Sequence, residues 1–167
     1  MLATEDAPLT LARLWREMTP AQRTAAAHAF WLDDDSMAQQ FETVTHLARS
    51  LHFRPQSVLG LPVDRKVRQM AGQARLPDAV IARALVVYHL AAQRPLLVAF
   101  LDHLGIPHED GLISDTMGEK PAPDRVTAAA QALLAAFPEA DVRLYLRTLA
   151  VQDPETWGML AGSAGAV

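Results

Sequence analysis

The stretch Ala79–Ala92 has the sequence AVIARALVVYHLAA, and it determines the fold that we expect. It is apolar on nearly every side, and Arg83 and His89 are its only basic residues. Pro77 precedes it at the first-turn position of a helix, where the missing N–H costs nothing. A helix that is apolar all round has to be covered on most sides. The stretch therefore predicts a central, buried helix over residues 77–92, with His89 in or near the core.

Helical patterns continue on both sides of this stretch, whereas strand signals are almost absent. Ala, Leu, Gln, Arg and Glu fill most positions, and most prolines stand just before a helical pattern. We therefore expect no β-hairpin. Helices are predicted at 9–18, 20–32, 36–52, 62–72, 77–92, 95–104, 123–136, 139–150 and 154–161. The fold class that follows is all-α, with about eight or nine helices.

Several of these helix ends carry capping signals. The segments Thr19–Gln22 and Ser36–Gln39 match the capping box, in which the N-cap residue and the third helical residue bond each other's backbone N–H. Asp153 can cap the last predicted helix. Gly105 stands where a residue in the left-handed conformation commonly ends a helix.

The composition limits both the size of the fold and the functions it can have. A chain of 167 residues suggests one domain, expected over residues 1–161 with a frayed tail at 162–167. Half of the residues are hydrophobic and 20% are charged, which excludes a disordered chain. The net charge of −4 does not favour binding of nucleic acid or anionic lipid by the molecule as a whole. The absence of cysteine excludes disulfides, thiolate metal sites and cysteine nucleophiles.

No segment is expected to enter or cross a membrane. The first 18 residues carry acids where a signal peptide carries basic residues, and they lack its apolar core. The most apolar stretch, Ala79–Leu104, is divided by Arg83, by His89 and by residues 93–95 into pieces too short to span a bilayer. A cytoplasmic location is therefore expected.

Three segments share one order of parts, which suggests an internal repeat. Each begins with a proline, at Pro20, Pro77 or Pro123, and an Ala-rich helix, followed by a second helix, another proline and a short segment. Units of this kind bury their apolar faces by stacking on their neighbours. We expect stacked helix pairs that form a compact bundle or a short α-solenoid, similar in architecture only to HEAT and armadillo repeats. The alternative is an irregular bundle with coincidental spacing, and no motif places the chain in a known family.

The segment Leu101–Lys120, LDHLGIPHEDGLISDTMGEK, is a candidate chemical site because it is rich in histidine and acids. A loop could bring His103, His108 and Glu109 together around a metal or a small ligand. The two histidines are five residues apart, which is not the spacing that puts two ligands on one helical face. The simpler interpretation is structural: a helix end, then Pro107, then the polar first turn of another helix.

Motifs for cofactors and nucleophiles are missing. The chain contains no GxGxxG, no GxxxxGKS/T and no GxSxG. We therefore predict no cofactor, no metal ligand and no catalytic residue. If the histidine-rich segment is functional, we expect its longest non-helical part, Ser114–Ala122, to carry the function.

A cluster of basic residues makes segment 49–75 the strongest candidate for binding a partner. Asp64 is its only acid. We expect Val63, Val67, Met70 and Ala71 to form the buried stripe of its helix, so that Arg65, Lys66 and Arg68 point to solvent. The predicted partner-binding residues are Arg54, Arg65, Lys66, Arg68 and Arg75. A locally positive face on an acidic protein attracts a phosphate, a nucleic acid or an acidic partner, and the alternative is an ordinary solvated surface.

The same region suggests a helix-turn-helix over residues 63–85. Its second helix would be the recognition helix that enters the major groove of DNA. That helix has few polar side chains with which to contact base edges, and its apolar faces need to be covered. We therefore do not expect nucleic acid to be the partner.

The function that we predict is a non-enzymatic protein-interaction or scaffold domain with a protein partner. The first alternative is a small-ligand-binding protein or enzyme with a pocket between helices near His103, His108 and Glu109. The second is a DNA-binding regulator that uses residues 63–85. Self-association into a homo-oligomer is compatible with a chain that is half apolar.

Overall fold

The computed structural model describes residues 7–113 and 118–162, and it confirms an all-α protein. Its helices are α1 (Leu11–Glu17), α2 (Pro20–Leu32), α3 (Met37–Leu51), α4 (Pro55–Leu59), α5 (Val63–Ala71), α6 (Asp78–Ala92), α7 (Arg94–Leu104), α8 (Pro123–Ala136), α9 (Glu139–Gln152) and α10 (Pro154–Trp157). The remaining described elements are the 3-10 turns η1 (Asp34–Ser36) and η2 (Gly158–Ala161) and the strands β1 (His108–Glu109) and β2 (Leu112–Ile113).

Each of the nine predicted helices corresponds to an observed one. The last begins as α10 and continues as the 3-10 turn η2, and the short helix α4 is absent from the predicted set. Residues 114–117 of the predicted loop Ser114–Ala122, and residues 163–167 of the predicted frayed tail, lie outside the described residues. The single domain over residues 1–161 stays a prediction.

Capping follows the predicted signals at three of four ends. Thr19 and Gln22 form both hydrogen bonds of the capping box. Asp153 accepts a hydrogen bond from the Thr156 N–H, and Gly105 ends α7 with a φ of +67°. The capping box at Ser36 is wrong, because the Ser36 side chain makes no cap hydrogen bond.

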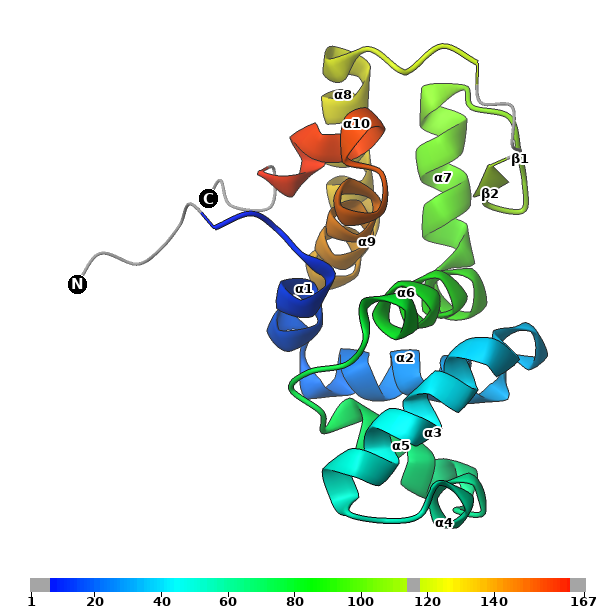
Figure 1. Cartoon of the computed structure of the whole chain (residues 1–167). Helices are drawn as coiled ribbons and strands as arrows, with labels where there is room; N and C mark the ends of the chain where they lie inside the picture. Colours follow the sequence, from blue (N-terminus) through cyan, green and yellow to red (C-terminus); the bar gives the residue numbers. More distant parts are fainter. Residues whose placement is uncertain (1–6, 114–117, 163–167) are drawn as a thin grey trace.

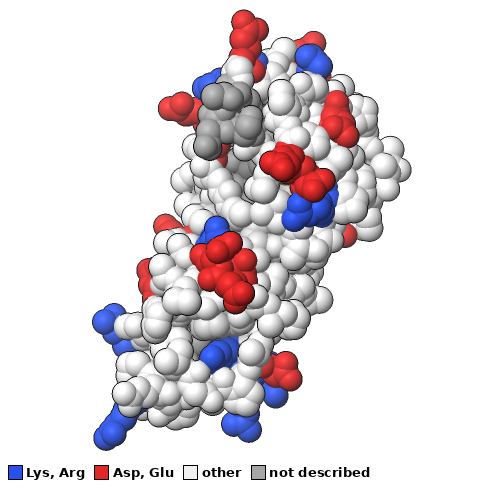
Figure 2. Space-filling view, turned by 90° about the vertical axis from the view of Figure 1, so that its right-hand side faces the viewer, with Lys and Arg blue, Asp and Glu red and all other residues white. Residues whose placement is uncertain are grey.

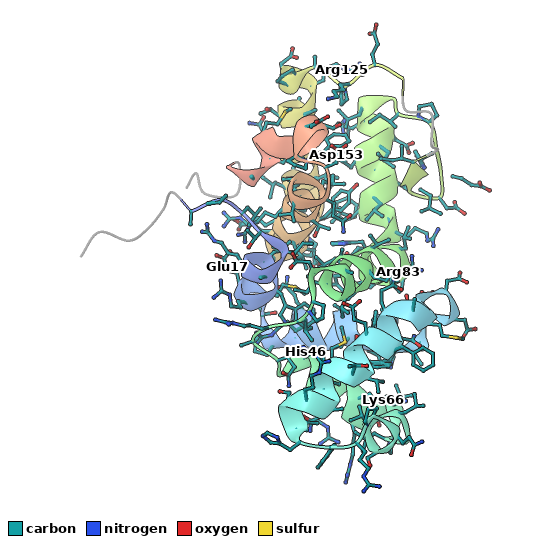
Figure 3. All side chains as sticks on the ribbon, in the orientation of Figure 1. Glu17, His46, Lys66, Arg83, Arg125 and Asp153 are labelled. Carbon is teal, nitrogen blue, oxygen red and sulfur yellow. The ribbon has the colours of Figure 1, made fainter. Side chains whose placement is uncertain are left out.

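Ser36 instead joins α6 to the corner between α2 and α3. Its buried hydroxyl donates to the Asp33 carboxylate and accepts from Arg83 Nε at 2.8 Å. Arg83 Nη2 also donates to Asp33 at 2.9 Å. The hydrogen bond from Ser36, together with the nearby guanidinium, holds the pKa of Asp33 below its ordinary value. Arg83, the one cation of the central helix, is therefore used to fix the neighbouring helices (Figure 3).

Helix α6 lies in the middle of the molecule, as the sequence predicts. Figure 1 shows α2, α3, α4 and α5 on one side of it and α7, α8, α9 and α10 on the other. Seven of its fifteen residues are buried. One of these is His89, whose Nδ1–H donates to the Leu85 carbonyl while Nε2 has no partner among the described residues. The predicted core histidine is confirmed.

Three clusters of buried apolar residues hold these helices together. The first joins α7, α8, α9 and α10 and contains Phe100, Leu133 and Trp157. The second joins α1, α2, α5 and α6 around Trp15 and Phe30. The third is small and joins α3 to α4 through the residues Val44, Leu47, Ala48 and Val58.

The predicted absence of a β-hairpin is wrong, and so is the helical turn expected after Pro107. Strands β1 and β2 pair antiparallel, with Glu109 opposite Leu112. The two residues between them, Asp110 and Gly111, have φ values of +49° and +89°, as a type I′ turn requires. The Asp-Gly dipeptide was present in the sequence, and it is the strongest short signal for such a turn.

Replacing Gly111 with alanine is expected to lower the free energy of unfolding by about 1–3 kcal/mol. The positive φ strains an L-residue, and the added Cβ would lie 3.0 Å from the Leu97 Cβ. Gly158→Ala is the matched control, since its φ is −53° and nothing lies within 4 Å of the new Cβ. Urea denaturation followed by circular dichroism measures both, and equal stabilities would contradict the turn geometry.

The repeat architecture is not confirmed. The first and third units end in the helices α4 and α10, whereas the middle unit ends in the hairpin. Within the described residues no single helix is long and apolar enough to cross a membrane. Helices α6 and α7 reach that length and hydropathy only together, and they are bent by 91° where they meet.

Candidate functional site

An apolar hollow lies where α2, α3, α4 and α5 meet. We call it the α3–α5 hollow, and its volume is about 260 Å³. The residues that line it are Trp31, Met37, Gln40, Phe41, Leu59, Val63 and Lys66. Figure 3 shows Lys66 in this part of the molecule, close to α3 and α4.

The hollow exists because two apolar stripes extend beyond the helices that cover them. In α3, Val44 and Ala48 are buried, but Met37 and Phe41, which continue the same stripe toward the N-terminus, are exposed. In α5, Val67 and Met70 are likewise buried, but Val63, which begins the same stripe, is exposed. The exposed fractions are 60% for Met37, 55% for Phe41, 48% for Leu59 and 37% for Val63.

One prediction is corrected here. Val63 was expected in the buried stripe, but it is exposed at the N-terminal end of α5. Trp31 is half-buried: it packs against two of the core clusters and also lines the hollow. Met37, Phe41 and Leu59 were not predicted as site residues at all. The stripe spacing in α3 was a usable signal, since it shows an apolar face longer than one short partner helix can cover.

Lys66 is held at the hollow by an aromatic ring. Its Nζ lies 5.4 Å from the centre of the Trp31 ring, within the range of a cation–π interaction. Trp31 also packs edge-on against Phe30, with ring centres 5.3 Å apart. The prediction that Lys66 points to solvent is therefore only half right, because it is half-buried.

The other predicted partner-binding residues are exposed arginines. These four form no side-chain ion pair or hydrogen bond with any described residue: Arg54, Arg65, Arg68 and Arg75. Arg65 and Arg68 lie one turn apart on α5 and line a separate depression together with Gln69. Neither Arg54 nor Arg75 lines the α3–α5 hollow. Of the five predicted residues, the structure therefore places Lys66 in the lining of the hollow, and Arg65 and Arg68 on another side of the same helix.

Charge is divided unequally along the molecule. Residues 37–77 contain six basic and two acidic residues, whereas the rest of the chain contains nine basic and seventeen acidic residues. In Figure 2, basic side chains surround a broad uncharged surface in the lower part, and most acidic side chains lie higher. The hollow lies between the basic helix α5 and the exposed acids Asp34 and Asp35, which stand in η1 just before α3.

The histidine-rich segment forms a structural contact. His108 Nε2 lies 2.8 Å from an oxygen of Asp102, and His108 Nδ1 accepts the Gly111 N–H at 3.1 Å. Because Nδ1 accepts, the proton of the neutral ring is on Nε2, which donates to the carboxylate. The Nε2 bond thus ties the hairpin to α7, and the Nδ1 bond stabilises the turn within the hairpin. No group of three possible metal ligands gathers anywhere in residues 7–113 and 118–162.

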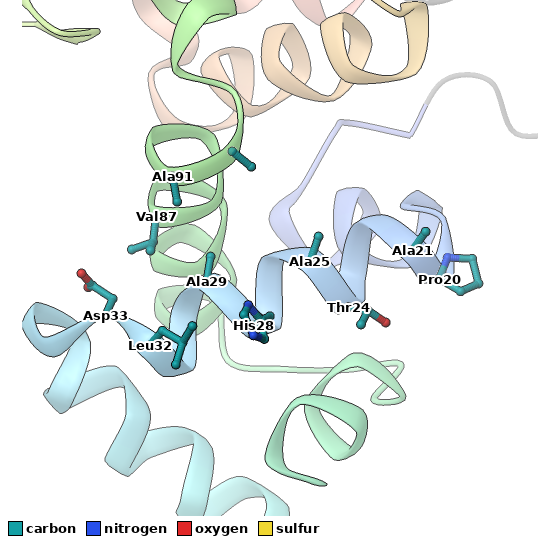
Figure 4. A pocket seen from close by; sticks show the side chains of 11 residues that line it. Pro20, Ala21, Thr24, Ala25, His28, Ala29, Leu32, Asp33, Val87 and Ala91 are labelled. Atoms are coloured by element: carbon teal, nitrogen blue, oxygen red, sulfur yellow. The ribbon is translucent and has the colours of Figure 1, made fainter. Parts of the chain in front are cut away.

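A second, wider groove runs along α2 and the end of α6. Figure 4 shows Ala21, Ala25 and Ala29 on α2 facing it, with Val87 from α6 at one end. Its volume is about 950 Å³, and alanine is the commonest residue in its lining. The polar lining residues are Thr24, His28 and Asp33, and the Asp33 carboxylate is already bonded to Ser36 and Arg83. Only two exposed polar side chains of the lining are then left to fix a small ligand.

Comparison with models of known protein families, with curated proteins and with solved structures finds no match to this chain. The class that the fold and the surface define is an all-α protein with an apolar hollow beside a basic helix.

Proposed function

We propose that this protein is a non-enzymatic interaction domain that binds a partner protein at the α3–α5 hollow. The observation that carries the proposal is the gathering of Met37, Phe41, Leu59 and Val63, all large, apolar and exposed, around one depression. Single exposed apolar side chains are ordinary on a protein surface, whereas a contiguous group of them marks an interaction site.

The size and chemistry of the hollow favour a protein partner over a small ligand. A volume of about 260 Å³ is below the roughly 300–1,000 Å³ of ligand pockets, but it can hold partner side chains. Gln40 is the one uncharged polar residue in the lining, and its amide N–H groups already donate to the Phe30 and Asp33 carbonyls. Few polar groups are left to orient a substrate.

Binding of DNA through residues 63–85 receives less support. The would-be recognition helix α6 is the central helix, and seven of its residues are buried. A helix buried on most sides cannot enter the major groove of DNA. The cytoplasmic location expected from the sequence stays a prediction.

We predict that Phe41→Glu abolishes recovery of the partner. A charge at the centre of an apolar contact leaves an unpaired, desolvated carboxylate, which should weaken binding by at least about tenfold. The measurement is affinity capture from native lysate with the full chain, followed by quantitative mass spectrometry.

Leu134→Glu is the matched control, because Leu134 is an exposed apolar residue on α8, outside the hollow. Proteins recovered by the wild type and by the control, but not by Phe41→Glu, support the proposal. Since Phe41 is exposed, both variants should unfold within about 1 kcal/mol of the wild type. Identical sets of recovered proteins for all three chains would contradict the proposed function.

A further inference from the structure

We propose that the hollow binds an amphipathic helix of the partner, and that acidic side chains flank the apolar stripe of that helix. This inference rests on the proposed function and adds the chemistry of the partner to it. Two features of the surface carry it: the way its backbone groups are used, and the unpaired cations beside it.

The surface around the hollow consists of helices, and this favours a partner segment that is itself helical. Beyond their first turns, α3 and α5 satisfy their backbone groups internally, so they offer a partner mainly side chains and no row of N–H and C=O groups like that of a sheet edge. An extended peptide gains affinity mainly from main-chain hydrogen bonds to an exposed sheet edge. The strand pair of this protein packs on α7, away from the hollow (Figure 1). A helix satisfies its own backbone and can insert apolar side chains at i, i+3 and i+4.

The cations select the charge of the partner. Arg65, Lys66 and Arg68 lie within one turn of α5, and no carboxylate among the described residues pairs with any of them. Lys66 lines the hollow itself, where the surrounding apolar side chains lower the local dielectric and strengthen a charge pair. An acidic side chain beside the apolar stripe of the partner would complement Lys66 in the hollow, and Arg65 and Arg68 add positive potential from another side of α5.

The Trp31 ring prepares Lys66 for this role. The cation–π contact restrains a side chain that otherwise loses much rotamer freedom on pairing. The Lys66 side chain has then already lost part of its conformational entropy in the free protein, so less is lost on binding. We therefore expect Lys66 to contribute more to binding than the freely exposed arginines near it.

The test is selection from a displayed library of 18-residue peptides. Four positions spaced as i, i+3, i+4 and i+7 are drawn from Leu, Ile, Phe and Met, and the other positions from Asp, Glu, Lys, Arg, Gln, Ser and Ala. The full chain is the target, and peptides that also bind Phe41→Glu are discarded. We expect the selected peptides to be enriched in Asp and Glu, at least about threefold over Lys and Arg.

Binding of the selected peptides is measured by tryptophan fluorescence. Trp15 and Trp157 are buried, so Trp31 is the tryptophan that a ligand in the hollow can reach, and the peptides contain no tryptophan. Trp31→Phe should remove the signal. Lys66→Glu should weaken binding by about tenfold, whereas Lys120→Glu, the same change outside the hollow, should leave it unchanged.

The possible results separate this inference from the proposed function. Enrichment of basic or neutral peptides, or no enrichment, overturns the inference. If lysate capture still depends on Phe41 in that case, the proposed function stands without it. Concentration-dependent dimerisation that Phe41→Glu abolishes, seen by analytical ultracentrifugation, would show that a second copy occupies the hollow and would also overturn the inference.

Discussion

Replacing Phe100 with alanine is expected to lower the free energy of unfolding by about 3–5 kcal/mol, the largest effect of a single substitution that we predict. Phe100 is fully buried in α7. Its ring lies edge-on to Tyr145 at 5.6 Å between ring centres, and 5.7 Å from the ring centre of Trp157. It thereby joins α7 to α9 and α10. The substitution removes apolar area from the core and leaves a cavity that these helices can fill only in part.

Urea denaturation followed by circular dichroism measures this loss, and thermal unfolding should show a fall of about 10 °C in Tm. Phe53→Ala is the matched control, since the Phe53 side chain is exposed and its loss should cost under about 1 kcal/mol. A loss of less than about 1.5 kcal/mol for Phe100→Ala would show that the aromatic contacts do not hold this half of the molecule together.

Acidification from pH 7 to pH 5 is expected to lower the free energy of unfolding by about 2 kcal/mol through His89 alone. Burial lowers the pKa of His89 from 6.5 to about 4, because the charged ring would lose its hydration inside the core. Above pH 6.5 the ring is neutral in both the folded and the unfolded chain, so it contributes no pH dependence. As the pH falls from 6.5 toward 4, only the unfolded chain gains the proton, and stability declines.

The measurement is a series of urea denaturation curves between pH 7 and pH 5, a range above the ordinary pKa values of the carboxylates. In His89→Phe, which keeps an aromatic ring beside Tyr88 and Tyr145, this part of the slope should disappear. His28→Phe, at an exposed position of α2, should keep the slope of the wild type. Equal slopes for wild type and His89→Phe would mean that protonated His89 is accommodated in the folded state.

The helices were predictable because their signals are local. Pro20 at a first turn, Thr19 with Gln22, and Gly105 at a helix end each act within about four residues, and all three are found where expected. Pro77 stands one residue earlier than expected, at the N-cap of α6. Ser36 shows the limit of such reasoning. Its local sequence matches a capping box, but its hydroxyl accepts a hydrogen bond from Arg83, which lies 47 residues further along the chain.

The hairpin shows a different limit. Two-residue strands are too short to display alternation, so only Asp110-Gly111 could have revealed them, and that signal was overlooked. In the histidine-rich segment the structure replaces the helical turn expected after Pro107 with a hairpin. His108 pairs with Asp102 there and accepts the Gly111 N–H.

The candidate site was predictable only in part. The cluster of cations at 65–68 is visible in the sequence because it depends on charge alone, and the structure places one of them, Lys66, in the hollow. The apolar half of the site was missed, since Phe41 and Val63 belong to stripes that look like any buried stripe. Only their exposure distinguishes them.

The sequence by itself determined that the protein is helical, that the helix at 77–92 is central, and that residues 49–75 are basic. These properties follow from the intrinsic preferences and periodicity of neighbouring residues. The tertiary structure alone decided which apolar residues are covered. Coverage depends on which helices pack together, and Trp31, Phe41 and Val63 meet at one hollow only because α2, α3 and α5 converge there.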